Sequence, residues 1–484
     1  MRRSILLTTL AVLLVGLTVV VVALVAPRPA QPPTLPGAAA PAPQEPVEAA
    51  DGIGDAYFPR AGNAGYEVAA YDVELGYEPA TDRLEGRTTV TGTAVAALRS
   101  FTLDLRLPAT SVEVGGQPAA FAQDGGELRV TPADPVAAGA ELRVVVAYAG
   151  VPSQIPDPAG VAPPWTRAPD GAVAVGQPQS AAWWFPSNDH PSDKATVAVT
   201  VDVPAGVEVV SHGALLDGPQ PQPDGRDRWR WRADEPMATY LAFVAIGQYD
   251  LVRRDTPVGP YLAAYPAGTA GPARRTLERT PQVVGELAEV FGPYPFGQLG
   301  GVVAPIEGFA LETQTRPVYP ADFLRGPTGI DVVVHELAHQ WFGDSVAVAR
   351  WRDIWLNEGF ATYAEWLYGE RTGGVPAAQA ARDTYAAIPA NDPFWQVPPG
   401  DPGPENLFDS AVYQRGGMAV QAIRTAVGDE DFARLLRTWT AERAGGTGTV
   451  EDFLALAEQV SGEELDTVAQ EWLYDRDRPP APPG

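Results

Sequence analysis

The stretch GIDVVVHELAHQWFG at residues 329–343 decides the fold of the second half of the chain. Its apolar residues recur at helical spacing, so we expect a helix that packs against a core. His335 and His339 are four residues apart on that helix and therefore lie one turn above each other. Two imidazoles on an otherwise apolar helix are costly to bury without a compensating partner, which predicts that they bind a metal ion.

The composition restricts the kind of metal site. The chain has no cysteine, so thiolate zinc sites, iron–sulfur clusters and disulfides are excluded. Zinc accepts imidazole nitrogen and carboxylate oxygen, and a catalytic zinc site takes three protein ligands. Glu358 is the candidate third ligand, because 18 residues separate it from His339, enough for a loop and a return helix. Glu336 lies between the histidines and is the candidate general base. The alternative for Glu358 is a solvated residue in the first turn of a helix.

Three further acidic residues are candidates for hydrogen bonds that orient the imidazoles, namely Asp344, Asp353 and Glu365. Helix capping or surface charge explains them equally well at this point. The two remaining histidines, His190 and His212, are interpreted as structural.

The hydrophobic pattern predicts an α+β protein in which strands precede helices. Short alternating runs broken by turn residues indicate a β-rich domain over residues 51–263. Helical periodicity follows, and we expect a mainly helical catalytic domain over residues 264–475. The Pro-rich residues 476–484 are expected to form a disordered tail.

The N-terminus predicts export. Residues 1–26 contain Arg2 and Arg3, followed by an apolar run from residue 5 to residue 26 that is long enough to cross a bilayer. We expect an uncleaved membrane anchor with the rest of the chain outside the cytoplasm. A cleaved signal peptide is the alternative. The Pro/Ala-rich residues 27–50 are expected to form a spacer.

The charge restricts the class of partner. The formal net charge is -26, and Lys194 is the only lysine. Nucleic-acid binding requires a basic surface, so we expect no nucleic-acid partner.

The motifs HELAHQWFGDSV (335–346) and WRDIWLNEGFATYAEW (351–366) resemble the aminopeptidase N family of zinc metallopeptidases, the gluzincins that include leukotriene hydrolase. The resemblance extends over the general layout from about residue 66 to residue 474. It implies a saddle-like β-rich domain, then a thermolysin-like catalytic domain with one zinc ion. It also implies that His335, His339 and Glu358 bind that ion.

The resemblance implies two further site residues. The family has a tyrosine that stabilises the tetrahedral intermediate, and AVYQRGG (411–417) places Tyr413 there, with Arg415 in place of a lysine. The family also has a G-x-M-E-N segment whose glutamate binds the substrate α-amine. Here FALET (309–313) keeps only that glutamate, Glu312. The alternative for Tyr413 is a core tyrosine on a helix.

A third segment, GQPQSAAWWFPSNDHPSDKAT (176–196), resembles the second amine-binding motif of the family. Gln177 and Gln179 occupy the family's Gln and Glu/Gln positions. An amide accepts a hydrogen bond from an ammonium group without supplying charge, so a weaker amine affinity is implied. The alternative is that both are ordinary polar residues of a loop.

The expected function is therefore that of a zinc aminopeptidase acting on peptides or proteins. Only about 125 residues follow Glu358, so the cleft is expected to be more open than in larger relatives. A zinc endopeptidase is consequently the first alternative. A non-catalytic peptide-binding protein with the same fold is the second, and epoxide hydrolysis on the same zinc site has no residue that specifies it.

Overall fold

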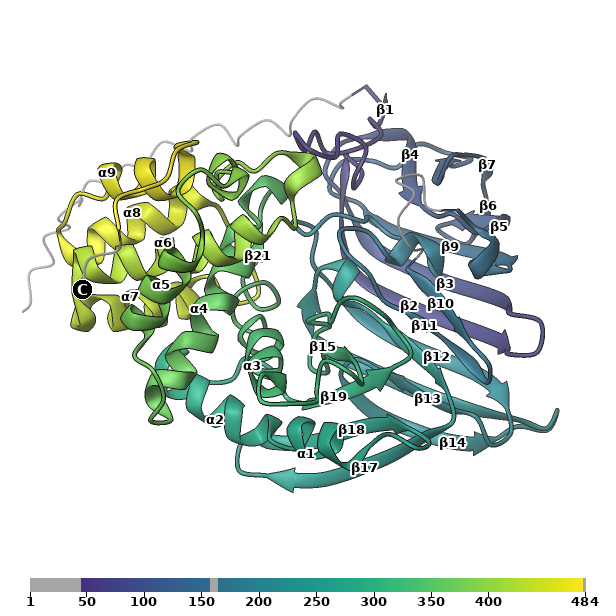
Figure 1. Cartoon of the computed structure of the whole chain (residues 1–484). Coiled ribbons are helices and arrows are strands. Elements are labelled where there is room, and N and C mark those ends of the chain that lie inside the picture. The colour runs from purple at the N-terminus through teal and green to yellow at the C-terminus, as the bar shows by residue number, and fades with distance from the viewer. Residues whose placement is uncertain (1–44, 157–163, 482–484) are drawn as a thin grey trace, which may run out of the picture. The chain divides into compact units, whose positions relative to one another are not determined.

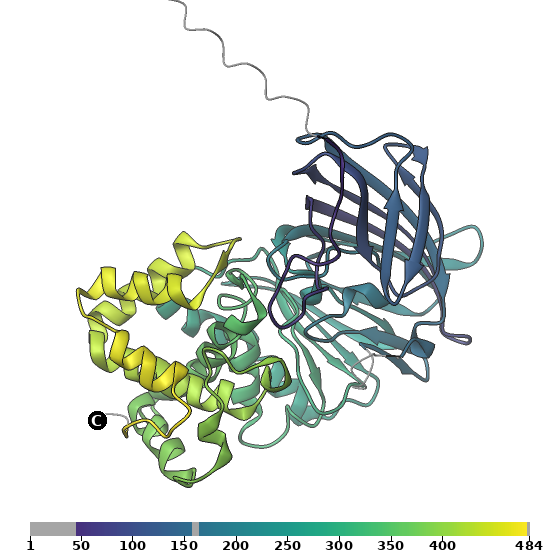
Figure 2. The same ribbon diagram turned by 90° about the horizontal axis from the view of Figure 1, so that it is seen from above.

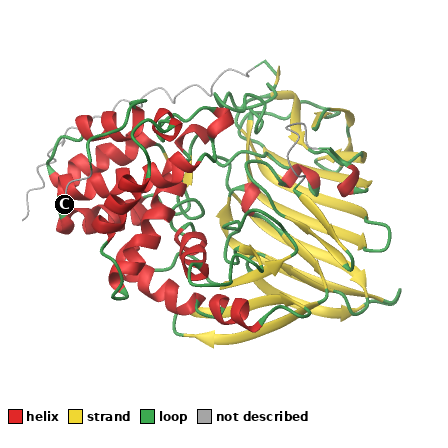
Figure 3. Cartoon of the chain, in the orientation of Figure 1, coloured by secondary structure: helices red, strands yellow, loops and turns green. Residues whose placement is uncertain are grey.

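The computed structural model describes residues 45–156 and 164–481, and all of them belong to one compact unit from Gln44 to Gly484. Strands make up the first part of this unit and helices the last, so the predicted α+β class is confirmed. The strands gather on one side and the helices on the other (Figure 1 and Figure 3), and Figure 2 shows the same separation from above.

An eight-stranded sheet dominates the β-rich part. Alternating residues produce it: in strand β12 the valines at 197, 199, 201 and 203 are buried, while the residues between them are partly exposed. β12 runs parallel to β2, and the other pairs of this sheet are antiparallel. In spatial order the strands are β14 (Ala214–Pro221), β15 (Arg226–Met237), β12 (Ala195–Pro204), β2 (Tyr66–Glu78), β3 (Arg83–Ala94), β9 (Glu141–Gly150), β5 (Ala109–Val114) and β6 (Gln117–Pro118).

Two four-stranded sheets accompany the large sheet. The first has the order β1 (Val47–Glu48), β4 (Leu98–Asp104), β8 (Glu127–Thr131) and β7 (Ala120–Asp124). The second has the order β10 (Trp165–Ala168), β11 (Gly171–Ala174), β16 (Val244–Gly247) and β13 (Glu208–Ser211). β1 pairs with β4 although it lies inside residues 27–50, the expected spacer. Of that spacer, only residues 45–50 are described, and they contribute a strand to the β-rich part.

A fourth sheet connects the two parts of the chain. Its order is β17 (Tyr249–Thr256), β18 (Gly259–Pro266), β19 (Leu299–Ala304) and β20 (Val318–Pro320). β19 is buried throughout, as expected of a strand that pairs in parallel on both sides. The boundary expected between residues 263 and 264 falls inside β18. The change of periodicity marks the first helix, whereas the sheet that supports the helices already begins with β17.

The helical part contains nine α-helices within the described residues. They are α1 (Gly271–Leu277), α2 (Thr280–Phe291), α3 (Gly329–Ala338), α4 (Trp355–Arg371), α5 (Ala377–Ala387), α6 (Ser410–Val427), α7 (Asp429–Glu442), α8 (Val450–Ser461) and α9 (Asp466–Ala469). A π-turn (Gln470–Tyr474) follows α9, and the short strands β21 (Ala347–Val348) and β22 (Thr447–Gly448) pair between the helices. Within the tail 476–484, which was expected to be disordered, Pro479 is held in place. Its carbonyl oxygen accepts a hydrogen bond from the hydroxyl of Tyr385 in α5 at 2.7 Å.

Helices α4 and α6 cross with their backbones in contact. The crossing point is Gly359 in α4 and Gly416 in α6, where a Cβ atom added to either residue would lie 3.0 Å from the backbone of the other. Glycine permits this close approach, because a methyl group on either residue would be in tight contact with the backbone of the other helix. Glu358 immediately precedes Gly359, so this crossing also fixes the position of a candidate metal ligand.

Lys194 joins the β-rich part to the helical part. Its ammonium group donates to the carbonyl oxygens of Asp344 at 2.7 Å, Ser345 at 2.8 Å and Gly446 at 3.5 Å. A second contact of this joint is made by Asp55, whose Oδ2 accepts a hydrogen bond from the backbone N–H of Trp351 at 3.0 Å. Two residues from the first half of the chain, Asp55 and Lys194, therefore hold the loops that flank α3 and α4.

The structure does not test the expected membrane anchor. Among residues 45–156 and 164–481, no helix is both long and apolar enough to span a bilayer. The apolar run at residues 5–26 lies outside the described residues.

Candidate active site

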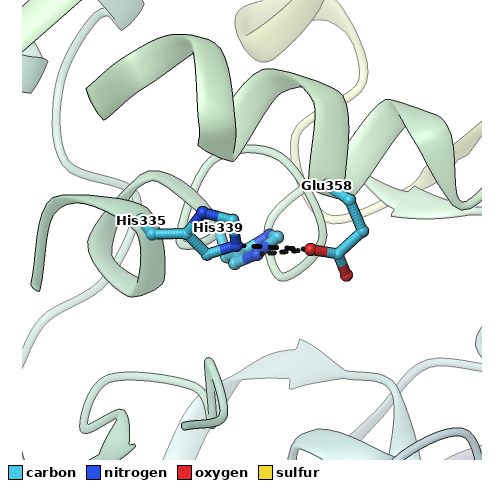
Figure 4. Close-up of side chains that lie close together, drawn as sticks. All are labelled: His335, His339 and Glu358. Atoms are coloured by element: carbon cyan, nitrogen blue, oxygen red, sulfur yellow. Dashed lines mark hydrogen bonds and ion pairs between the residues drawn. The ribbon is translucent and has the colours of Figure 1, made fainter. Parts of the chain in front are cut away.

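Helices α3 and α4 bring the three candidate metal ligands together, as Figure 4 shows. His335 lies in the last turn of α3, His339 is the first residue after that helix, and Glu358 lies in the first turn of α4. One ligand atom from each of them lies within 4.8 Å of the others. The predicted alternative of a solvated Glu358 is excluded, because this side chain is only 3% exposed.

Each imidazole is oriented by a hydrogen bond on the nitrogen that faces away from the cluster. His335 Nδ1 lies 2.7 Å from Glu365 Oε1, and His339 Nδ1 lies 3.0 Å from the carbonyl oxygen of Phe342. Both acceptors favour the tautomer with hydrogen on Nδ1, which leaves Nε2 of each ring free to bind a metal. Glu365 is thus one of the three acidic residues considered as imidazole partners, and it contacts His335.

The other two acidic residues do not contact an imidazole. Asp353 forms an ion pair with Arg350 at 2.7 Å, so its interpretation as an imidazole partner is wrong. Asp344 contacts His339 through its backbone N–H, which donates to the His339 carbonyl at 2.9 Å. The partner of His339 is instead a backbone carbonyl, which side-chain chemistry alone could not predict.

The spacing of the ligand atoms fits zinc. Nε2 of His335 and Nε2 of His339 each lie 3.3 Å from Glu358 Oε2. A tetrahedron with metal–ligand bonds of about 2.0–2.1 Å has an edge of about 3.3 Å, so both histidine–glutamate distances match those around a tetrahedral zinc ion.

The electrostatics of the site also fit a cation. Burial raises the pKa of both Glu312 and Glu336, which lie close to Glu358. Burial would lower the pKa of His339, but Glu358 and Glu312 outweigh it and raise the pKa. Without a metal, the site therefore gains positive charge by holding protons. A divalent cation supplies the same charge and lets the imidazoles bind as neutral ligands.

The remaining candidate residues surround this centre. Glu336, on α3, is almost fully buried, with 6% of its surface exposed. Tyr413, in the first turn of α6, stacks on His335 with ring centroids 5.8 Å apart and an interplanar angle of 20°. Burial and the nearby Glu358 raise the pKa of Tyr413, so its phenol keeps its proton and remains a hydrogen-bond donor.

Glu312 lies in the loop between β19 and β20 and is held by two donors. Gln177 Nε2 donates to Glu312 Oε1 at 3.1 Å, and Tyr240 Oη donates to the same oxygen at 3.0 Å. A carboxylate oxygen of Glu312 also lies within 4.8 Å of ligand-type atoms of Glu336 and His339. The anionic group predicted to bind an amine is therefore next to the metal centre.

Comparisons with known proteins agree with this geometry. Residues 327–472 match the model of the peptidase family M1 domain. The crystal structure of an M1 zinc metallopeptidase from Deinococcus radiodurans superposes with a TM-score of 0.81 and 31% sequence identity, over 89% of this chain and 99% of that protein. This chain belongs to peptidase family M1. The predicted resemblance to the aminopeptidase N family and the predicted cofactor, one zinc ion, are thereby confirmed.

Two other M1 relatives bear on the activity. A mutant of the Deinococcus radiodurans enzyme was crystallised with the substrate Tyr-Ser-Ala, and it has the same TM-score, identity and coverage. Aminopeptidase M1-A of Oryza sativa subsp. japonica is 26% identical over 337 residues, which cover 64% of this chain and 37% of that protein. The chain thus spans little more than a third of the length of this curated relative.

The M1 site includes one residue that the sequence did not indicate. Tyr240 bonds to Glu312 although 72 positions separate the two residues, and it belongs to no motif considered above. Its sequence context, TYLAFVAIG, carries no signal that distinguishes it from the rest of the predicted β-rich domain.

The two glutamines considered for amine binding are placed differently. Gln177 contacts Glu312, as described above. Gln179 instead lines a cavity of about 360 Å³ together with Phe58, Asp104 and Asp189. No hydrogen bond between Gln179 and Glu312 occurs among the described residues. Of the two residues, Gln177 is therefore the one adjacent to the metal centre.

Proposed function

We propose that this M1 peptidase is a zinc aminopeptidase that releases the N-terminal residue of peptides. The observation that supports it best is the short distance between Glu312 and the ligand cluster, within 4.8 Å of His339. A carboxylate this close to the metal leaves room for one residue between a bound α-amine and the scissile carbonyl. An endopeptidase requires free space at that position instead.

The proposed ligands are His335, His339 and Glu358, for which the tetrahedral spacing is the support. A zinc ion bound there supplies Lewis acidity, which polarises a carbonyl group and makes water a better nucleophile. Glu336 takes a proton from the attacking water and delivers it to the leaving amine. Its burial suits this role, because a raised pKa brings a carboxylate closer to the pKa of a useful general base.

The other residues orient the substrate. Gln177 and Tyr240 both bond to Oε1 of Glu312, so the α-ammonium of a peptide would bind Oε2. The Tyr413 phenol donates a hydrogen bond to the oxyanion that develops at the scissile carbonyl. Gln179 remains a proposed contact for the α-amine, supported only by its place in the segment that resembles the second amine-binding motif of the family.

Two peptides test the proposal directly, Tyr-Ser-Ala and its N-acetylated form. We expect free tyrosine from the first peptide and no cleavage of the second, because acetylation removes the charge that binds Glu312. Equal cleavage of both would contradict the aminopeptidase proposal and favour the endopeptidase. Stoichiometric zinc without cleavage of either would favour the non-catalytic peptide-binding protein.

We further propose that the folded body lies outside the cytoplasm and is attached to the cell membrane by the N-terminal helix. The support is the sequence alone, namely Arg2 and Arg3 before the apolar residues 5–26. Membrane fractionation with alkaline extraction tests attachment. Mass spectrometry of the N-terminal peptide distinguishes the anchor from a cleaved signal peptide.

A further inference from the structure

Arg415 is a fully buried arginine that forms no ion pair within the part of the chain that the structure describes. It lies in α6, and its side chain is 0% exposed. All the hydrogen bonds of its guanidinium go to backbone carbonyl oxygens: those of Trp472 (2.9 Å), Trp395 (2.7 Å), Val397 (3.5 Å), Glu471 (3.0 Å) and Asp475 (2.7 Å). A guanidinium has five N–H donors in a planar fork, and here five acceptors meet them.

These carbonyls come from two segments that lie far apart in the sequence. One is the short 3₁₀ turn Pro393–Gln396 with the residue after it, and the other is the π-turn Gln470–Tyr474 with the residue after it. Carbonyls at the end of a helical segment are electron-rich, so a buried cation is favourable there. Arg415 therefore ties the C-terminal segment 470–475 to the N-terminal half of α6.

The opposite side of α6 faces the metal centre. Residues two apart on a helix are separated by about 200°, so Tyr413 and Arg415 project from opposite sides. Gly416 lies on the side of Tyr413 and contacts Gly359 of α4, next to Glu358. The N-terminal half of α6 therefore packs between two elements, namely α4, which carries Glu358, and the C-terminal segment 470–475.

We infer that Arg415 is a positioning residue for Tyr413. Its hydrogen bonds to the segment 470–475 hold α6 against α4, and this packing fixes the position of the Tyr413 phenol next to His335. The inference rests on the proposed function insofar as Tyr413 acts on the substrate. According to this inference, the C-terminal segment 470–475 contributes to the geometry of the active site. A lysine cannot replace Arg415 fully, because its three donors do not form a fork.

A double-mutant cycle tests the kinetic side. We expect Arg415→Lys to lower kcat roughly tenfold to a hundredfold with little change in KM, because small misplacements of a catalytic group cost rates of this order. In a Tyr413→Phe background, the same substitution should lower kcat less than twofold. Equal losses in both backgrounds would overturn the inference, since they would show that Arg415 acts independently of Tyr413.

A spectroscopic measurement tests the position of the ring without any turnover. Tyr413 is replaced by 3-fluorotyrosine, and its ¹⁹F resonance is recorded in zinc-free and zinc-loaded protein. We expect Arg415→Lys to shift or broaden this resonance in both forms. An unchanged resonance would overturn the inference. If the unsubstituted chain shows no peptidase activity, the proposed function fails, whereas this measurement still decides the role of Arg415.

Arg424 provides the matched control. It lies on the same helix, nine residues after Arg415, and pairs with Asp429 at 2.7 Å and Glu370 at 3.3 Å. Arg424→Lys should leave kcat and the ¹⁹F resonance unchanged. A resonance that responds equally to both substitutions would show general loosening of α6, which would also contradict the inference.

Discussion

Glu312 depends on its neighbours for its orientation. Its Oε1 receives hydrogen bonds from two different parts of the β-rich region, Gln177 before β12 and Tyr240 after β15. Loss of either donor removes a hydrogen bond to a buried carboxylate, and such bonds contribute about 1.5–3 kcal/mol. The effect of losing one donor should appear in the recognition of the free amine.

Tyr240→Phe tests this dependence. We expect kcat/KM for Tyr-Ser-Ala to fall roughly tenfold, mainly through KM, because the carboxylate loses one of the two bonds that orient it. Steady-state kinetics of amino-acid release measure the effect. Tyr77→Phe is the control, since it removes a buried hydroxyl that bonds only within the β-rich part, to Asp82 at 2.8 Å. Equal effects of the two substitutions would contradict the assignment.

Glu336→Gln tests the general base. The amide has the same shape but cannot accept a proton, so we expect kcat to fall by about 10²–10⁴. Zinc content, measured by atomic absorption, should remain at one ion per chain because Glu336 is not among the three proposed ligands. Unchanged turnover in this variant would refute its role.

The sequence predicted the central residues because their spacing is local. His335 and His339 are one helical turn apart, and Glu358 follows His339 after 18 intervening residues, so a pattern of residues was sufficient. Tyr240 could not be predicted in this way, because only the folding of a 72-residue segment brings it to Glu312. Gln177 and Gln179 could not be distinguished for a related reason: the path of one loop decides which amide reaches the site.

Helices α3 and α4 hold the metal centre through contacts beyond the ligands themselves. Glu365 lies two turns after Glu358 on α4 and orients His335 of α3. The glycine crossing of α4 and α6 lies one residue from Glu358. Zinc affinity and stability should therefore depend on these helix contacts.

Glu365→Gln is expected to weaken zinc binding about tenfold, the lower end of the usual effect of such partners, because an acceptor remains but its charge is lost. Competition with a chromophoric chelator measures the affinity. Asp353→Asn is the matched control, since its carboxylate pairs with Arg350 and touches no imidazole. A weakening of similar size in the control would contradict the role of Glu365.

Gly359→Ala is expected to destabilise the protein by about 1–3 kcal/mol, because the new methyl group would lie 3.0 Å from the backbone of Gly416. Gly285→Ala in α2 should have the opposite effect. Its Cβ would meet nothing nearer than 4.0 Å, and alanine is favoured over glycine in a helix by about 0.5–1 kcal/mol. Urea unfolding measures both changes. A neutral result for Gly359→Ala would show that the crossing can adjust.

Helix periodicity predicted the order of the elements better than their grouping. α3 begins at Gly329, where the apolar spacing places it, but it ends at Ala338, before the expected end at residue 343. The boundary between the two parts was harder to predict, because β17 and β18 resemble the preceding strands in sequence. Only the pairing of β18 with β19 places this hairpin in the sheet that supports the helices. Parallel pairing joins segments that are distant in sequence, so a local pattern cannot reveal it.

For the molecule as a whole, zinc should contribute to stability as well as activity. The metal binds the folded state and offsets the repulsion among buried Glu312, Glu336 and Glu358. We expect removal by a strong chelator to abolish peptide release and lower the unfolding temperature, and zinc in excess to restore both. Free zinc at about a hundred times its Kd corresponds to roughly 2.7 kcal/mol of stabilisation. An unfolding temperature independent of zinc would contradict metal binding at this site.

Lys194 makes the opening of the joint between the two parts measurable. It is the only lysine, and its amine is engaged by the carbonyls of Asp344, Ser345 and Gly446. An amine-reactive reagent can modify it only while those contacts are broken, so the rate of labelling at this side chain reports how often the joint opens. A mass-spectrometric time course would then measure the rate at which these contacts open. A bound peptide should slow the labelling of Lys194.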